Sequence, residues 1–457
     1  MGALRGANGG FGMPEQIFSA PQEQIEPVAL THDEPRSKSP SAEQVETLLG
    51  YATTGRFVEA ESLARSFTCD FPTDPLGWKT LGVVLKVLGR TDEALGALER
   101  LLELVPNDAE AHNNLGVILR DLGRLVEAEE SYRQALAIAP DYAEAHSNLG
   151  STLRDLGKSS GAAASYSKAI TLQPDDSGAR YSLGVLLYDN QQYAEAERLF
   201  ASVETEKGKS YAVRCAYHLD DRSSFYDKLD TFLEQYPANA VIGALSHSAE
   251  RKYGAKRPNA FCNDPLKYVA EVNLLEKYDF MSVFAAPVNR VLSEDVVGRQ
   301  QRLLYNGAQT AGNIFAHPEI QTAGIEDLLR FEIEAYRRRH INRGEGFIQR
   351  WPSSFEIYGW LIKMQSGGEL KPHIHDDGWI SGSIYINVPP KAEPHSGSLV
   401  LCLGDQAGDS KTGEGEQSII DVNTGSLCLF PSSLHHYTIP FVSSDSRIVL
   451  AFDMRPI

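Results

Sequence analysis

The sequence has little of what marks secreted, membrane-spanning or nucleic-acid-binding proteins. Its five cysteines among 457 residues are an odd number without a CxxC pair, which favours a reducing compartment. No apolar run approaches the roughly 18 residues of a membrane span, and the first residues lack the basic-then-apolar order of a secretion signal. Acidic residues outnumber basic ones by 61 to 43, and the net charge of -18 argues against a nucleic-acid backbone or an anionic membrane as the main partner. We therefore expect a soluble, cytoplasmic protein.

The length and the apolar content allow several domains. A chain of 457 residues with 42% hydrophobic residues is long enough to fill two or three cores. Residues 1–40 instead combine glycine, proline, glutamine and charge with little apolar periodicity. Such a segment buries too little apolar surface to offset the entropy of ordering, so we expect a disordered tail there.

Residues 41–205 repeat themselves with a period of 34 residues. A glycine marks the turn between two helices in the first four units, and Gln191 takes its place in the fifth. Small residues let paired helices approach closely, and proline ends the second helix of each unit. The pattern resembles an array of about five tetratricopeptide repeats, an α-solenoid. The recurring positions are Leu81-Gly82, Leu115-Gly116, Leu149-Gly150 and Leu183-Gly184, then Pro72, Pro106, Pro140 and Pro174, and Ala60, Ala94, Ala128, Ala162 and Ala196.

Stacked helix pairs form a curved surface whose inner face usually holds a peptide or a partner helix. The segments HNNLG and HSNLG, which contain Asn114 and Asn148, resemble the asparagine-bearing repeats of the O-linked N-acetylglucosamine transferase array. The resemblance implies that these two asparagines bind the backbone of a protein or peptide partner. Thr80 and Ser182 occupy the neighbouring equivalents, so such a ladder is short. The alternative is that the asparagines are surface polar residues of a scaffold.

The pattern changes twice in the rest of the chain. Residues 206–258 have a helical pattern but do not continue the 34-residue repeat, which predicts a helical cap and linker. Residues 259–457 begin with helical stretches and continue with short alternating segments, such as the one from Ile380 to Val388. Many short antiparallel strands after a helical start favour a double-stranded β-helix, or jelly roll, with flanking helices. The predicted fold class is therefore α+β and multidomain.

The histidines near the C-terminus have the spacing of metal ligands. On an extended segment, side chains two residues apart share a face, so His373 with His375, or His375 with Asp377, can reach one ion. A third ligand then comes from a distant strand, and His436 is the best candidate. Neutral imidazole suits iron, zinc, copper or nickel, and two histidines with one carboxylate leave three positions of an iron open. The competing interpretation is polar residues at a strand end and a loop.

The same region resembles the iron- and 2-oxoglutarate-dependent oxygenases, specifically a bacterial-type branch often fused to tetratricopeptide repeats. The resemblance covers about 200 residues, from Asn259 to the end. The segments that carry it are Gly367-Gly368, Pro372-His373-Ile374-His375, GWISGSIY at 378–385, Phe430-Pro431-Ser432, His436 and RIVLAFD at 447–453.

The family's residues imply a metal site and a cosubstrate site. His373, His375 and His436 would hold Fe(II), and Asp377 is the alternative carboxylate ligand because His375-x-Asp377 is itself a His-x-Asp pair. Arg447 would pair with the distal carboxylate of 2-oxoglutarate, for which a guanidinium is a bidentate partner.

Two further residues and the reaction follow from the same resemblance. Tyr385 and Ser381 are candidates for cosubstrate binding, with a structural role in the strand as the alternative. The implied activity is that of a dioxygenase, in which dioxygen and 2-oxoglutarate are consumed and a protein or peptide held by the array is hydroxylated. Two alternatives remain: a non-catalytic interaction scaffold whose jelly roll is a relic or a structural metal site, and a metal-dependent enzyme that does not use 2-oxoglutarate.

Overall fold

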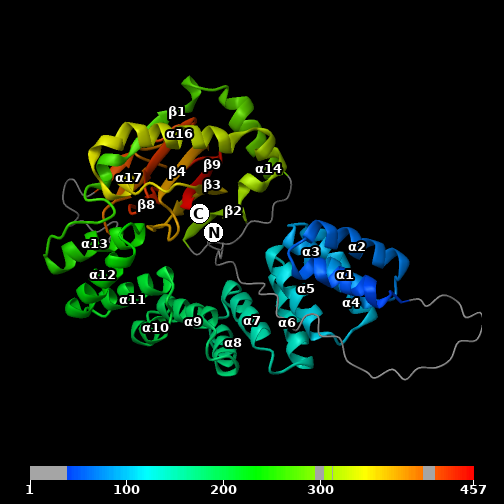
Figure 1. The fold of residues 1–457 in the computed structure, drawn as a ribbon. Coiled ribbons are helices and arrows are strands. Elements are labelled where there is room, and N and C mark those ends of the chain that lie inside the picture. The colour runs from blue at the N-terminus through cyan, green and yellow to red at the C-terminus, as the bar shows by residue number, and fades with distance from the viewer. Residues whose placement is uncertain (1–38, 294–302, 311, 405–416) are drawn as a thin grey trace, which may run out of the picture. The chain divides into compact units, whose positions relative to one another are not determined.

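The computed structural model describes residues 39–293, 303–310, 312–404 and 417–457. The chain divides into two compact units, Met1–Val203 and Glu204–Ile457. The first unit is helical and the second contains the sheets (Figure 1), so the predicted fold class is confirmed. The predicted tail lies, up to residue 38, outside the described residues, and the limits at 205 and 258 stay predictions. None of the described helices is long and apolar enough to cross a bilayer.

The first unit consists of antiparallel helix pairs joined by tight turns. Aspartates begin several of the helices, for example Asp108, whose side chain accepts a hydrogen bond from the amide of Ala111. The turn within each pair needs a left-handed residue, which is glycine in the first four units and Gln191 (φ 62°) in the fifth. The helices are α1 Ala42–Thr53, α2 Phe57–Asp70, α3 Pro75–Val87, α4 Thr91–Leu104, α5 Ala109–Asp121, α6 Leu125–Ile138, α7 Ala143–Asp155, α8 Ser159–Leu172, α9 Ser177–Asp189 and α10 Tyr193–Phe200.

The glycine of each recurring Leu-Gly pair makes room for a large side chain of the partner helix. A Cβ on Gly116 would lie 2.7 Å from the ring of Tyr132, and one on Gly150 would lie 2.8 Å from the ring of Tyr166. Both rings are fully buried. The sequence period thus records a helix-to-helix contact that is repeated in successive units.

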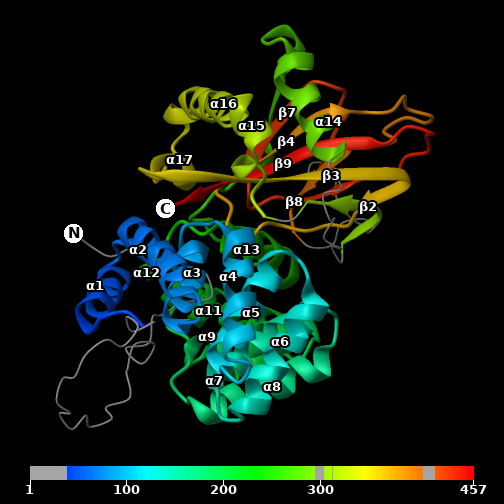
Figure 2. The ribbon, with the colours of Figure 1, turned by 90° about the vertical axis from the view of Figure 1, so that its right-hand side faces the viewer.

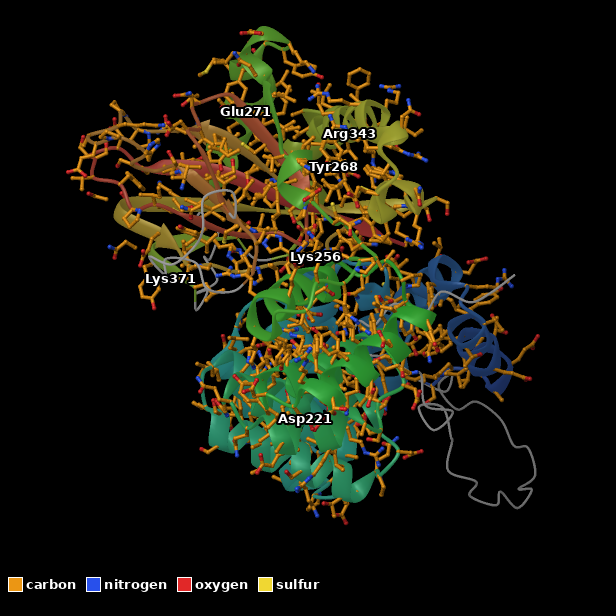
Figure 3. The ribbon with its side chains drawn as sticks, turned by 90° about the vertical axis from the view of Figure 1, so that its left-hand side faces the viewer. Asp221, Lys256, Tyr268, Glu271, Arg343 and Lys371 are labelled. Atoms are coloured by element: carbon orange, nitrogen blue, oxygen red, sulfur yellow. The ribbon has the colours of Figure 1, made fainter. Side chains whose placement is uncertain are left out.

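The second unit begins with three helices and continues with two antiparallel sheets. The side chain of Asp221 caps α12 by accepting from the amide of Ser224 (Figure 3). The main sheet has the order β1-β7-β4-β9-β3-β2, and the smaller sheet has the order β6-β5-β8. The helices are α11 Glu206–His218, α12 Arg222–Gln235, α13 Ala240–Tyr253, α14 Ala286–Ser293, α15 Pro318–Thr322, α16 Ile325–His340 and α17 Gly346–Gln349. The strands are β1 Ala270–Asn273, β2 Leu304–Gln309, β3 Phe355–Leu370, β4 Ile380–Asn387, β5 Leu399–Cys402, β6 Gln417–Ile420, β7 Ser426–Pro431, β8 His435–Thr438 and β9 Arg447–Pro456.

The two faces of the main sheet have different partners. One face packs against α16 (Figures 1 and 2), and Leu329 and Ile333 of that helix share a core with Ile384 of β4. The opposite face, together with the smaller sheet, lines a pocket to which β4 contributes Ser381 and Tyr385. The predicted alternation along β4 is therefore present, but its polar face lines a cavity instead of meeting solvent.

We predict that the substitution Gly150→Ala destabilises the first unit. The new methyl group would overlap the buried ring of Tyr166, and overpacking of this kind lowers the free energy of unfolding by about 1–3 kcal/mol. Gly96→Ala is the matched control, because Gly96 is also within a helix but has open space around it. That change is expected to be neutral or to stabilise by up to about 1 kcal/mol. Urea unfolding followed by circular dichroism measures both, and equal unfolding midpoints for Gly150→Ala and wild type would contradict the packing argument.

Candidate metal centre and anion pocket

Three histidines from two parts of the jelly roll meet at one end of the pocket. His373 and His375 lie in the link between β3 and β4, residues 371–379, and His436 lies in β8. His373 and His436 form an antiparallel bridge in which each amide donates to the other's carbonyl, at 3.2 and 2.9 Å. The bridge joins the link of the main sheet to a strand of the smaller sheet. Backbone pairing therefore brings together residues 63 positions apart in the sequence.

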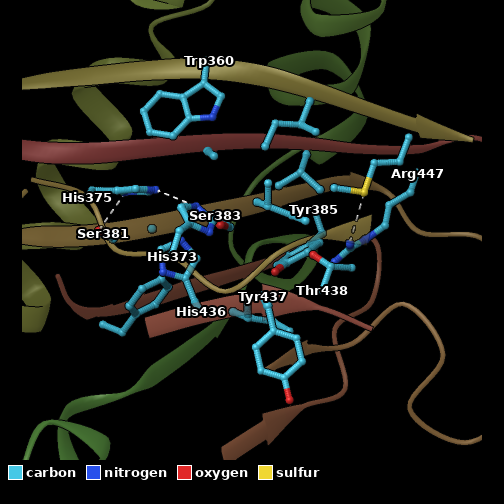
Figure 4. Close-up of a pocket in the computed structure, with 18 residues that line it drawn as sticks. Trp360, His373, His375, Ser381, Ser383, Tyr385, His436, Tyr437, Thr438 and Arg447 are labelled. Carbon is cyan, nitrogen blue, oxygen red and sulfur yellow. Dashed lines mark hydrogen bonds between the residues drawn. The ribbon is translucent and has the colours of Figure 1, made fainter. Parts of the chain in front are cut away.

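The three rings converge closely (Figure 4). One ring nitrogen from each histidine lies within 4.8 Å of the others. The Nε2 atoms of His373 and His375 are 3.2 Å apart, and the ring centroids of His373 and His436 are 4.2 Å apart. Two nitrogens bound at about 2.1 Å to one ion at a right angle would be about 3.0 Å apart. The spacing therefore fits two ligands of a single metal ion.

The hydrogen bonds of the rings orient the Nε2 lone pairs toward one another. Each Nδ1 faces an acceptor: the carboxylate of Asp453 for His375 at 2.6 Å, the carbonyl of Lys371 for His373 at 2.8 Å, and the carbonyl of Leu434 for His436 at 3.3 Å. An acceptor at Nδ1 places the proton there and leaves Nε2 as a lone pair.

Burial keeps two of these rings neutral. It lowers the pKa of His373 to about 3 and the pKa of His436 well below its ordinary value. Neutral imidazoles with converging lone pairs repel one another, and a cation between them would stabilise the arrangement. The donor set therefore fits the iron that the sequence resemblance implies, as well as zinc, copper or nickel.

Asp453 and Ser381 contact the Nδ1 side of the His375 ring. Asp453 is 1% exposed, and its Oδ1 also accepts a hydrogen bond of 2.8 Å from Ser381 Oγ. Ser381 Oγ lies 2.8 Å from Ser432 Oγ, and a Cβ on Gly378 would lie only 2.5 Å from that same Ser432 oxygen. Asp453 belongs to the RIVLAFD segment at 447–453, but the sequence resemblance implied no role for it. Asp453 directly follows the apolar run from Ile448 to Phe452, which predicts a buried position. Because buried carboxylates are rare unless they are paired, this position was the signal that Asp453 has a partner.

The two acidic residues after His375 point elsewhere. Asp377 Oδ1 lies 2.7 Å from Lys207 Nζ of α11, and Asp376 Oδ2 accepts from the Tyr211 hydroxyl at 3.3 Å. Asp377 is thus engaged in an ion pair outside the cluster formed by the three histidines.

Arg447 lies at the other end of the pocket (Figure 4), at the start of β9. Its side chain is 1% exposed, its Nε has no hydrogen-bond partner, and no carboxylate of the described residues lies within 4 Å of it. Its Nη1 donates to the sulfur of Met364 at 3.9 Å, and its guanidinium lies 5.2 Å from the centroid of the Tyr385 ring. Burial lowers the pKa of Arg447, although a guanidinium remains charged at neutral pH. An uncompensated buried cation is costly, and an anion bound in the pocket would offset that cost.

The other predicted residues have different positions. Tyr385 is buried in the pocket wall beside Arg447, and Ser381 is occupied by Asp453. In the first unit, Asn114 is 5% exposed in α5, and the amide of Asn148 in α7 donates to Asn113 of α5 at 3.0 Å. Asn148 therefore takes part in a contact between neighbouring repeats.

Comparisons with known proteins agree with both parts of the chain. Residues 358–453 match the family described as "Putative 2OG-Fe(II) oxygenase", and residues 80–143 and 147–211 match the tetratricopeptide repeat family. The chain therefore combines tetratricopeptide repeats with a domain of the 2-oxoglutarate–Fe(II) oxygenase kind, which confirms the resemblance seen in the sequence. No curated protein matches the chain.

Three solved structures illustrate the similarity of the helical part of the chain to known folds. PilF of Pseudomonas aeruginosa is 20% identical, with a TM-score of 0.39, and the match covers 43% of this chain and 91% of that one. PilW, a type IV pilus biogenesis factor, is also 20% identical, with a TM-score of 0.39 and coverage of 43% and 93%. YrrB, titled as a TPR protein with an unusual peptide-binding site, is 20% identical, with a TM-score of 0.34 and coverage of 37% and 91%.

We predict that Asp453→Ala weakens metal binding without removing a ligand. His375 would lose the acceptor that orients its ring, and loss of such an outer partner typically lowers metal affinity about 10- to 100-fold. Calorimetric titration with Co(II), a redox-stable probe, measures the change. Asp445→Ala is the control, because Asp445 precedes the same strand but is exposed. Unchanged Co(II) affinity in folded Asp453→Ala would show that the carboxylate does not support the site.

Proposed function

We propose that this protein is an Fe(II)- and 2-oxoglutarate-dependent dioxygenase that hydroxylates a protein or peptide held by its repeat array. One observation carries the proposal: a single pocket has three converging imidazole nitrogens at one end and a buried guanidinium without a carboxylate partner at the other. The first feature suits a metal ion and the second suits an anion. 2-Oxoglutarate connects them, because it can bind the metal through its keto acid and the guanidinium through its distal carboxylate.

In this proposal, His373, His375 and His436 hold the metal through Nε2. Three ligands leave open positions for the cosubstrate and dioxygen, and the bound iron supplies the oxidative decarboxylation that leads to hydroxylation. Asp453 keeps His375 in its tautomer and orientation, and Ser381 supports His375 through Asp453 and through its own contact of 3.3 Å with His375 Nδ1. Asp377 is not needed as a ligand, since its carboxylate pairs with Lys207.

Arg447 and Tyr385 form the proposed cosubstrate site. The guanidinium offers a fork of donors that matches a carboxylate, and it lies in a site from which water is largely excluded. Burial raises the pKa of Tyr385, so its hydroxyl stays protonated and able to donate a hydrogen bond. Leu399 and Val449 contribute apolar side chains to the lining of the pocket. Such a lining strengthens the attraction between Arg447 and the cosubstrate.

The repeat array is proposed to hold the polypeptide substrate. Tetratricopeptide repeats generally bind proteins or peptides, and the first unit contains polar side chains on consecutive first helices. Asn148 donates its amide hydrogen to Asn113, which leaves its carbonyl oxygen available for a backbone amide of a peptide. Asn114 is the matching residue one repeat earlier.

The alternative is an interaction scaffold whose jelly roll has no catalytic activity. In that case the histidines would bind a structural metal ion and Arg447 would have no ligand.

Succinate release from 2-oxoglutarate distinguishes the two functions without knowledge of the substrate, because oxygenases of this kind turn over slowly when uncoupled. We expect the anaerobically purified chain, supplied with Fe(II), ascorbate and air, to release succinate, and His436→Ala to release none. If wild type shows neither turnover nor binding of 2-oxoglutarate in the presence of metal, the scaffold is the better assignment.

We predict that Arg447→Met weakens cosubstrate binding but leaves metal binding unchanged. Methionine fills similar space without the buried charge, and a lost hydrogen-bonded ion pair typically weakens binding by about tenfold to a hundredfold. Anaerobic calorimetry of 2-oxoglutarate with the Co(II)-loaded chain measures the first effect, and Co(II) titration measures the second. His436→Ala is the matched comparison and is expected to lose both. Retention of wild-type affinity for 2-oxoglutarate in Arg447→Met would refute the assignment of Arg447.

A further inference from the structure

One face of α11 contacts the segment that follows His375. Lys207, Tyr211 and Arg214 stand at positions i, i+4 and i+7 of this helix and so lie on one side of it. Lys207 Nζ lies 2.7 Å from Asp377 Oδ1. The Tyr211 hydroxyl and the Arg214 guanidinium lie 3.3 and 3.4 Å from the same oxygen of Asp376. The contacts join residues more than 160 positions apart in sequence, all within the second unit.

Short backbone hydrogen bonds hold both ends of the 371–379 link, whereas the amides of Asp376 and Asp377 make none among the described residues. The link begins at Lys371 (Figure 3), whose amide donates to Leu303, and it ends at Trp379, whose amide donates to Met454. His373 is paired with His436. The turn that contains Asp376 and Asp377 is closed by one long backbone hydrogen bond, in which the Gly378 amide donates to the His375 carbonyl at 3.4 Å. The side-chain contacts of Asp376 and Asp377 with α11 add a second restraint to the turn directly after His375.

We propose that α11 positions the metal site, with Lys207, Tyr211 and Arg214 as positioning residues that hold the Asp376–Asp377 turn. This inference rests on the proposed metal site. His375 is linked covalently to the restrained turn, and a metal site tolerates displacements of only about 0.5 Å in its ligands. Restraint of the next two residues keeps the His375 Nε2 at its distance of 3.2 Å from the His373 Nε2.

The positioning residues are themselves ordered. The Arg214 guanidinium lies 4.2 Å from the centroid of the Tyr211 ring, and Tyr211 is 8% exposed. An arginine stacked on a buried ring loses less freedom when it binds a carboxylate. By contrast, the Lys207–Asp377 pair is exposed enough to contribute little to global stability. Removal of these contacts is therefore expected to change the geometry of the turn more than the folding of the chain.

The test compares Co(II) binding by the full chain and by the triple variant Lys207→Gln, Tyr211→Phe, Arg214→Gln. We expect about tenfold weaker affinity, as for loss of outer partners of a metal site, and an altered visible absorption spectrum of the bound Co(II). Lys209→Gln is the matched control. It lies on the same helix but contacts Glu204 and Gln235 instead of the turn, so it should bind like wild type. A thermal melt of the metal-free proteins checks that folding is unchanged, and Tyr211→Phe alone replaces the triple variant if that variant does not fold.

A charge exchange separates positioning from a general structural effect. Lys207→Asp places two carboxylates together and should weaken Co(II) binding, whereas Lys207→Asp combined with Asp377→Lys restores the ion pair and should restore affinity and spectrum. Wild-type Co(II) binding by the folded triple variant, or the absence of recovery in the exchanged pair, overturns the role of α11 and leaves the metal site standing. If wild type itself binds no Co(II), the metal site fails, and the role of α11 fails with it.

Discussion

The pair of backbone hydrogen bonds between His373 and His436 is the constraint on which the site depends. It joins the link of the main sheet to β8 of the smaller sheet, so it closes one end of the pocket and brings three imidazoles together. The carbonyls of Lys371 and Leu434, each two residues from its histidine, orient two of the rings locally, and the bridge brings these rings together. Backbone hydrogen bonds thus account for the convergence of the three imidazoles, and the carboxylate of Asp453 adds the orientation of His375.

Strand β9 connects the two ends of the pocket. Arg447 and Asp453 are six residues apart on one strand, and because side chains alternate, both point to the same face. At about 3.3 Å per residue, they stand about 20 Å apart along the strand. Arg447 is therefore aimed at the anion end, while Asp453 supports His375 at the metal end. Because β9 is paired with β3 on one side and β4 on the other, it holds the two charged residues at a fixed separation.

The sequence was informative where a local pattern has a direct structural meaning. The 34-residue period predicted the array because Gly116 and Gly150 accommodate Tyr132 and Tyr166 in successive units. The spacing of the histidines predicted a cluster. It did not predict that Asp453 would orient the ring of His375 or that Asp377 would pair with Lys207. Those contacts join residues 78 and 170 positions apart, and no periodicity in one sequence records pairings of that kind. Only the three-dimensional fold shows that Asp453 contacts His375 while Asp377, the carboxylate predicted as an alternative ligand, pairs with Lys207.

The charges of the pocket suggest why its two ends belong to one function. In the protein alone, Arg447 has no carboxylate partner at its end of the pocket, and the negative charge of Asp453 lies at the metal end, 3.9 Å from Arg455. In the proposed function, a divalent metal ion bound alone would add two positive charges to a buried site, and a 2-oxoglutarate dianion bound alone would add two negative ones. When both bind, the added charges cancel. Because each ligand would remove the electrostatic cost of the other, metal and cosubstrate binding would be thermodynamically coupled, and the coupling would be reciprocal. A site that used Asp377 as a ligand would already hold one more negative charge, and its attraction for the dianion would be weaker.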